Sequence, residues 1–219
     1  MHSKNFLTGI AIALLSFAAL TITAQDSLYL VFLNTNPDRV KLPDTEVAEL
    51  QKGHLANIGS LYDQGDLLLA GPFDGGGGVF VLSAKTQADA EALLATDPAI
   101  SANRFRIETY PMRIDKGMIC RQDEPYEMVQ FNFIQFTPGN PDGDGNWRAK
   151  ELYDDHEKVV FAFSLNDRRF IEILAGESDA ESYAKNHPLV LNGQYSYKIL
   201  PWWSTSKTFC TDKNRKLNY

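Results

Sequence analysis

The sequence predicts an α+β protein built from two related units in tandem. Residues 79–111 align without a gap on residues 169–201 at a constant offset of 90, and the only two cysteines, Cys120 and Cys210, obey the same offset. Each unit then has roughly 90–100 residues, the size of a small α+β domain that is marginal alone. We therefore expect the two units to pack against each other as a pseudo-dimer.

The first unit has the element order β-α-β-β-α-β. Short β-rich runs predict strands at residues 28–33, 67–70, 79–84 and 104–110. Apolar residues at helical spacing predict a helix over residues 44–64, and Gly65 follows as its C-terminal stop. Thr86 and Asp89 form a capping pair for a second helix, which we expect to stop at Pro98. Two helices on one face of an antiparallel sheet in this order define the ferredoxin-like arrangement.

The second unit repeats this order in a degenerate form. Its predicted strands lie at residues 129–136, 159–164, 169–174 and 195–200, and its predicted helices at about 146–156 and at 178–186. It lacks the Gly71-Pro72 turn and the glycine run at residues 75–78 that the first unit carries. A function that depends on those segments is therefore expected in the first unit alone.

Composition shifts along the chain predict the domain boundaries. We expect a signal peptide at residues 1–24, a first domain at 25–114, a linker at 115–125, a degenerate second domain at 126–211 and a polar tail at 212–219. The two domains then account for most of the chain.

The N-terminus is predicted to be a secretory signal peptide. Lys4 precedes an apolar run at residues 6–20, and Ala24 ends the segment before the polar Gln25. We expect cleavage after Ala24 and a periplasmic or secreted product. An uncleaved anchor is the alternative, because the apolar run is just long enough to span a bilayer and Ile22 is larger than the residue preferred there. Contact with a membrane is expected only through this segment.

Charge and cysteine content limit the partners. The formal net charge is −7 without clusters of Lys and Arg, which disfavours nucleic acid and anionic membranes. In an exported protein, Cys120 and Cys210 form a disulfide if they lie near the pseudo-twofold axis, and two separate thiols are the alternative. The disulfide closes a loop of about 90 residues, which is worth on the order of 4 kcal/mol in the chain-entropy model.

His54 is the principal candidate for chemistry. Its helix carries an apolar line formed by Val47, Leu50, His54, Ile58 and Leu61, with separations of 3, 4, 4 and 3. His54 should therefore face the sheet, and Asp97 likewise ends an inward stripe of the second helix. A carboxylate beside an imidazole fixes its tautomer and stabilises the imidazolium, as a general acid or base requires. The alternatives are a histidine satisfied in the core and an aspartate that forms a local turn before Pro98.

The residues around this pair resemble the YCII-related (YciI-like) family. The resemblance is carried by His54, by residues 61–72 with their Ala-Gly-Pro ending, and by Asp97 before Pro98, and it covers about residues 28–114. It implies a ferredoxin-like fold assembled as a dimeric α+β barrel, here a pseudo-dimeric barrel within one chain. It also implies a cleft lined by the histidine and the aspartate.

Some members of that family are similar to enzymes that eliminate a halide from ring compounds. The resemblance therefore implies a cofactor-independent lyase or isomerase acting on a small cyclic organic molecule, with His54 as general acid/base and Asp97 as its orienting partner. We expect Gly71, Pro72 and Phe73 to line the substrate site. The glycine run at residues 75–78 follows them, and glycine there permits positive φ and lets a ligand approach the backbone. No metal and no cofactor are expected.

A non-catalytic small-molecule-binding or scaffold module is the alternative reading. It is motivated by the second unit, in which His187 replaces Asp97 and the Ala-Gly-Pro segment is missing. The identity of the ligand and a further homodimerisation of the fused pair are left open by the sequence.

Overall fold

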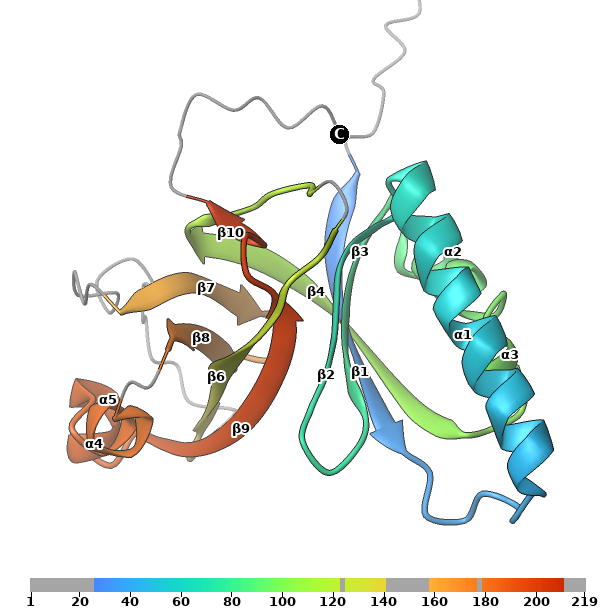
Figure 1. The fold of residues 1–219 in the computed structure, drawn as a ribbon. Coiled ribbons are helices and arrows are strands. Elements are labelled where there is room, and N and C mark those ends of the chain that lie inside the picture. The colour runs from blue at the N-terminus through green and yellow to red at the C-terminus, as the bar shows by residue number, and fades with distance from the viewer. Residues whose placement is uncertain (1–25, 123–124, 141–157, 177–178, 211–219) are drawn as a thin grey trace, which may run out of the picture.

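The computed structural model describes residues 26–122, 125–140, 158–176 and 179–210 (Figure 1). It is a mixed α+β structure with one large antiparallel sheet of eight strands in the order β2-β3-β1-β4-β7-β8-β6-β9. The predicted signal peptide at residues 1–24, the predicted helix at about 146–156 and the tail at 212–219 lie outside the described residues. None of the helices in the described ranges is long and apolar enough to cross a membrane.

The first half supplies four strands and three helices. They are β1 (Ser27–Thr35), α1 (Asp44–Gln64), β2 (Leu67–Pro72), β3 (Gly78–Ala84), α2 (Gln87–Leu94), α3 (Pro98–Ser101) and β4 (Phe105–Lys116). The sequence predicted each of these strands and both longer helices. The extra helix α3 was not predicted from the sequence, in which Pro98 was interpreted only as a stop. Pro98 in fact begins α3. Proline suits the first helical position because it has no N–H that would need a partner there.

The second half supplies the other strands of the large sheet. They are β6 (Met128–Pro138), β7 (Val159–Leu165), β8 (Phe170–Ala175) and β9 (Tyr195–Thr205), with the short helices α4 (Ala180–Lys185) and α5 (Pro188–Leu191) between β8 and β9. A second, two-stranded sheet pairs β5 (Met118–Ile119) with β10 (Phe209–Cys210). The expected linker at residues 115–125 is therefore partly structured, because it holds the end of β4 and all of β5.

The strands of the large sheet lie between two groups of helices. In Figure 1, α1, α2 and α3 cover the first half on one side, and α4 and α5 lie beside the second half on the opposite side. The edge strands β2 and β9 approach each other at an isolated antiparallel bridge between Phe73 and Trp202. The Asp74 N–H also donates to the Pro201 carbonyl over 3.0 Å. The two ends of the sheet thus meet.

The described residues form three hydrophobic clusters, divided by the alternation of side chains along the strands. On β1, Leu30 and Phe32 join an inner cluster shared by both halves, while Tyr29, Val31 and Leu33 face the helices of the first half. The inner cluster also takes Phe131, Phe133, Phe161, Phe163 and Trp202 from the second half. The third cluster lies under α4 and α5. β1 is buried on both faces because it stands between two of these clusters.

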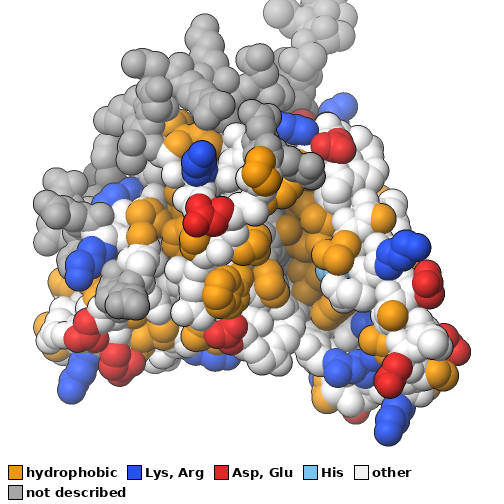
Figure 2. All heavy atoms as spheres, in the orientation of Figure 1, with side chains coloured by type: hydrophobic (Ala, Val, Ile, Leu, Met, Phe, Trp, Pro, Cys, Tyr) orange, Lys and Arg blue, Asp and Glu red, His pale blue; other side chains and the backbone are white. Residues whose placement is uncertain are grey.

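Helix α1 covers its sheet loosely. Of the apolar line that we expected to face the sheet, only Leu61 is fully buried, and Val47 remains 39% exposed. Figure 2 shows hydrophobic side chains lining a hollow between this helix and the strands. The amphipathic pattern therefore predicts which face of α1 points towards the sheet. Part of that face, however, lines an open groove and is not buried in the core.

The structure joins Cys120 to Cys210 in a disulfide, with the Cα atoms 6.0 Å apart and a sequence separation of 90. Cys210 lies on β10, which pairs with β5 immediately before Cys120. The bond therefore connects the ends of the two halves.

Candidate active site

Asp97 is held by the start of a helix. It is the N-cap of α3, and its Oδ1 accepts hydrogen bonds from the Ala99 N–H at 2.8 Å and the Ile100 N–H at 3.3 Å. Aspartate is a preferred N-cap because its side chain satisfies N–H groups that have no partner inside the helix. The side chain is only 1% exposed. One carboxylate oxygen is thus committed to the backbone, and the other is left for a further partner.

His54 is brought to Asp97 by the close packing of α1 on α3. The neighbouring residue, Gly53, lies so near α3 that a Cβ atom there would stand 2.6 Å from Pro98 Cγ. Only glycine allows this approach without a shift of one helix. The Asp97-Pro98 pair therefore has two functions, because it starts α3 and also provides the surface against which α1 docks.

The two side chains form a short hydrogen bond. His54 Nδ1 and Asp97 Oδ2 are 2.5 Å apart. The His54 ring stacks on Phe80 with centroids 6.0 Å apart and lies 5.8 Å from the Phe105 ring. The imidazole is thereby fixed in orientation by the carboxylate at one edge and by aromatic rings on its sides. The sequence stripe had placed both polar groups inward, and the tertiary structure brings them into contact.

The electrostatics of the pair favour an ionised carboxylate. Burial by itself raises the pKa of Asp97, but the hydrogen bond and charge of His54, together with the N–H groups of Ala99 and Ile100, outweigh burial and lower this pKa below its usual value. An ionised carboxylate only accepts hydrogen bonds, so the shared proton is assigned to His54 Nδ1. In neutral imidazole the other nitrogen, Nε2, then carries a lone pair.

The Nε2 atom is the reactive end of this arrangement. The described part of the chain provides no hydrogen-bond partner for it, and the His54 side chain is 12% exposed. A base needs access to the proton that it removes, and it needs a second group to stabilise the charge that it gains. His54 and Asp97 have this geometry.

Gly71, Pro72 and Phe73 lie elsewhere. A Cβ atom at Gly71 would stand 2.5 Å from Trp202 Nε1, and the Phe73 ring packs on Phe133 in the inner cluster. The His54 ring lies among residues of the cluster on the opposite face of the sheet. The expectation that these three residues line one site with His54 is therefore corrected. The Ala-Gly-Pro segment is instead the end of strand β2, where glycine at position 71 allows close contact with β9.

Two residues of the site were not identified in the sequence. Phe80 and Phe105 form the walls of the imidazole site. In the sequence each was interpreted only as an apolar residue of a strand. The available signal was their strand register: Phe80 alternates with buried Val79 and Val81, which face the inner cluster, so Phe80 must face the helices.

Position 187, the equivalent of Asp97 in the second half, also caps a helix but forms no histidine–carboxylate pair among the described residues. His187 is the N-cap of α5, and its Nδ1 accepts the Leu189 N–H over 3.3 Å. Burial lowers the pKa of His187 to about 4, so the imidazole is neutral at neutral pH. Helix capping is thus common to positions 97 and 187, whereas the histidine–carboxylate contact is described only at Asp97.

Glu172 is a buried carboxyl group in the second half that the sequence analysis did not single out. It lies on β8 with no exposed surface, accepts a hydrogen bond from the Tyr183 hydroxyl at 2.7 Å, and leaves its Oε1 without a partner. Burial raises the pKa of Glu172 to about 7, although the Tyr183 hydrogen bond and the charge of Lys116 lower it in part. A glutamate inside the apolar strand at residues 170–175 was the signal in the sequence.

Glu172 is expected to make the protein less stable at alkaline pH. The pKa of Glu172 is about 7 in the folded protein against an ordinary value of 4.5, so the folded state binds the proton more tightly. The stabilisation from this proton is complete below pH 4.5 and is lost as the pH rises through 7. The isosteric Glu172→Gln variant should therefore be more stable than the wild type at pH 8 by about 3 kcal/mol and equally stable at pH 4.5, as measured by urea unfolding. Equal stability of the two proteins at pH 8 would contradict the assignment.

Within the described ranges, no group of three or more His, Cys, Asp or Glu side chains is arranged to hold a metal ion. The His54–Asp97 pair offers one free imidazole nitrogen in an aromatic setting. The chemistry that this arrangement supports directly is proton transfer.

Comparison with known proteins identifies the first half. Residues 27–112 match the family model of the YCII-related domain, so the chain contains such a domain in its first half. No curated protein matches the chain. Among solved structures, it is similar to the crystal structure of a "putative monooxygenase" from Lactobacillus acidophilus NCFM, with 12% identity, a TM-score of 0.48, and coverage of 86% of this chain and 100% of that chain. This likeness is too distant to bear on function.

Proposed function

We propose that the YCII-related domain at residues 27–112 is a cofactor-independent lyase or isomerase domain that acts on a small cyclic organic molecule. His54 is the general acid/base and Asp97 is its positioning partner. The observation that carries the proposal is the 2.5 Å contact between His54 Nδ1 and the buried Asp97 carboxylate, which leaves Nε2 free. A buried Nδ1–H needs an acceptor in any case, so the feature that favours chemistry over a structural role is Nε2, which has no partner among the described residues.

The geometry suggests a simple reaction sequence. Nε2 removes a proton from a carbon atom that is made acidic by a neighbouring carbonyl group, and Asp97 stabilises the imidazolium that forms. In an elimination, the electron pair of the broken C–H bond forms a double bond and a halide or similar group leaves. In an isomerisation, the imidazolium returns the proton to another carbon atom of the same molecule. Both outcomes balance without an oxidant or a metal.

The two halves are proposed to be tandem ferredoxin-like units that form a pseudo-dimeric α+β barrel. Support comes from β4 and β9, from α3 and α5, and from the two cysteines, which all follow the sequence offset of 90. The Phe73–Trp202 bridge brings the edge strands together in the way that a closed barrel requires. On this proposal the second unit is a degenerate copy that contributes packing in place of a second histidine–aspartate pair.

We further propose that the protein is exported and that residues 1–24 are removed after Ala24. The Cys120–Cys210 disulfide supports an oxidising compartment such as the periplasm or the exterior of the cell. Mass spectrometry of the N-terminus of the protein recovered from its native host tests this directly. A mature chain that begins at Gln25 is expected, and a retained Met1 or Lys4 would contradict it.

A non-catalytic ligand-binding module is the second candidate. It is favoured by the capping role that Asp97 shares with His187, since a cap is useful without any chemistry. The two candidates differ in turnover. A screen of β-halogenated cyclic ketones and lactones, followed by halide release and by deuterium incorporation from solvent, separates them: the enzyme domain converts or exchanges at least one compound, and the binding module none.

The Asp97→Asn variant tests the role of the carboxylate. Asparagine is also a good N-cap, so α3 should be retained, but the imidazolium of His54 loses its neighbouring negative charge. We expect the rate to fall by about ten- to a hundredfold and the limb of the pH–rate profile that reports the base to move to lower pH. Asp179→Asn, the same change at the cap of α4, is the matched control and should leave the profile unchanged. A profile that does not move in Asp97→Asn would show that Asp97 is only a cap.

A further inference from the structure

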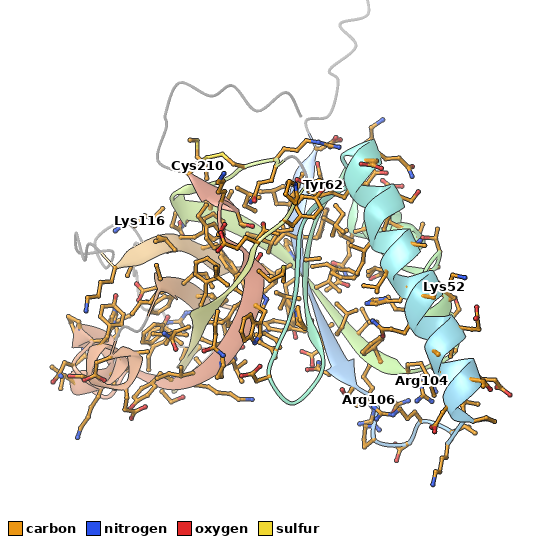
Figure 3. All side chains as sticks on the ribbon, in the orientation of Figure 1. Lys52, Tyr62, Arg104, Arg106, Lys116 and Cys210 are labelled. Carbon is orange, nitrogen blue, oxygen red and sulfur yellow. A yellow bond between two sulfur atoms is a disulfide. The ribbon has the colours of Figure 1, made fainter. Side chains whose placement is uncertain are left out.

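A pocket of about 210 Å³ lies where the two edge strands separate. β2 and β9 meet at the Phe73–Trp202 bridge, and beyond it the first residues of β2 and the last residues of β9 face each other across this pocket. Tyr62 closes another side and extends from α1 into the space between that helix and the strands (Figure 3). The pocket therefore draws its walls from both halves of the chain.

One wall of the pocket is a cluster of hydroxyl groups. Thr208 Oγ1 lies 3.2 Å from Ser204 Oγ and 2.5 Å from Thr205 Oγ1, and it also accepts from Gln122 Nε2 at 3.2 Å. A hydroxyl has one donor and two acceptor positions, so these three contacts occupy Thr208 fully. The Thr205 hydroxyl forms only one hydrogen bond within the cluster, out of the three that a hydroxyl can form. Its hydroxyl is thus available to a ligand, and the wall opposite it is the apolar surface of β2.

A glycine of α1 at this pocket is not explained by packing. A glycine in the interior of a helix costs about 1 kcal/mol relative to alanine. At Gly53 the close approach of Pro98 explains why glycine is required. At Gly59 no such reason is present, because a Cβ atom there would meet nothing within 4 Å. Gly59 lines the pocket. The space around Gly59 admits a methyl group, whereas a long side chain at this position would extend over the pocket.

The pocket adjoins the His54 site. Ile58 lines it and lies one turn beyond His54 on α1, about 6 Å along the helix axis. Ala70 also lines it and pairs in the sheet with Phe80, whose ring stacks on His54. The pocket and the imidazole therefore share neighbours, and His54 lies about one helical turn from the pocket lining.

The charges of the lining favour a neutral ligand. Of the described residues that line the pocket, Asp63 alone carries a charge, and its exposed side chain pairs with Arg121. A carboxylate ligand would meet a negative group here and no free positive one. The volume lies below that of pockets for drug-sized ligands, which begin at about 300 Å³.

We propose that this pocket binds the ring of the substrate, and that the ring is small, uncharged and bears a hydroxyl or carbonyl oxygen that bonds to Thr205. That the bound ring belongs to the substrate rests on the proposed acid/base function. The binding site itself stands on the pocket, the hydroxyl cluster and Gly59.

The test is a protein-observed NMR titration of the full chain with 4-hydroxybenzyl alcohol and with 4-hydroxybenzoate, which differ in charge. The alcohol should bind saturably, and the benzoate at least tenfold more weakly. Gly59→Leu, which narrows the pocket, should weaken binding of the alcohol at least tenfold while raising the melting temperature. Gly59→Ala is the matched control that gains the same helix propensity and should stay within twofold. Thr205→Val should weaken binding about threefold or more from the opposite wall.

The inference is overturned if Gly59→Leu binds the alcohol like the wild type, or if the benzoate binds as tightly as the alcohol. His54→Gln keeps the two proposals apart, because it should retain binding and lose turnover. If the alcohol binds and both variants weaken it, yet no halide release or exchange occurs, the pocket stands and the acid/base function fails. If turnover occurs with a KM that Gly59→Leu does not change, the function stands and the pocket is wrong.

Discussion

Replacing His54 with glutamine is expected to lower kcat by about 10²–10⁴ on any substrate that the halide-release or exchange screen identifies. Glutamine keeps a donor for the Asp97 carboxylate but has no basic nitrogen at the position of Nε2. The loss should therefore appear in kcat, with KM changed little, because the ring would still bind. Steady-state kinetics of the purified full chain measure both constants.

Stability has to be separated from chemistry in this variant. The flexible glutamine amide holds the hydrogen bond to the buried Asp97 carboxylate less well than the fixed imidazole, which costs on the order of 1–3 kcal/mol. Circular dichroism and urea unfolding give that loss, and kinetics are then measured under conditions in which both proteins are folded. His187→Gln is the matched control, since His187 is also buried but belongs to no pair with a carboxylate among the described residues. A kcat for His54→Gln within a few-fold of wild type would sink the acid/base proposal.

Removing the disulfide is expected to produce the largest loss of stability. The Cys120–Cys210 bond closes a loop with a sequence separation of 90. The chain-entropy model gives a stabilisation on the order of 4 kcal/mol for a loop of this length, because the bond restricts the unfolded chain. The double variant Cys120→Ala/Cys210→Ala should therefore lose about that free energy of unfolding in urea.

The single variants provide the control for the disulfide. Cys120→Ala and Cys210→Ala each break the same bond, so each should cost nearly as much as the double variant, and their effects should not add. The reduced wild type should match them, and its m-value should be larger because the unfolded chain is less compact. A loss below about 1 kcal/mol in the double variant would mean that the bond constrains little of the unfolded state.

Several elements followed from local sequence rules. β1 and β3 were visible as β-rich runs, α1 as an amphipathic stretch ending at Gly65, and the start of α2 as the capping pair of Thr86 and Asp89, which the structure forms in both directions. Each of these signals acts within a few residues. Single-sequence reasoning reaches such signals because capping, helical spacing and positive φ at glycine depend on near neighbours.

The short helices and strands were missed for a physical reason. α3 and α5 are each a single turn and β5 and β10 are two residues long, so periodicity has no length over which to appear. Pro98 was therefore interpreted as a stop, although it is also the first residue of α3. The end of β4 was assigned to a linker because its pairing with β7 is a contact between the two halves.

The sequence by itself determined that His54 and Asp97 point inward, that the first half resembles the YCII-related family, and that the two cysteines occupy equivalent positions. These conclusions rest on the spacing of residues along the sequence, which needs no knowledge of the tertiary structure. Only the tertiary structure decided that α1 docks on α3 closely enough to join the imidazole to the carboxylate, that Gly71 serves the contact between β2 and β9, and that a pocket opens beside Gly59. Those outcomes depend on how surfaces far apart in the sequence fit together, and the shape of such surfaces is not encoded in any local pattern.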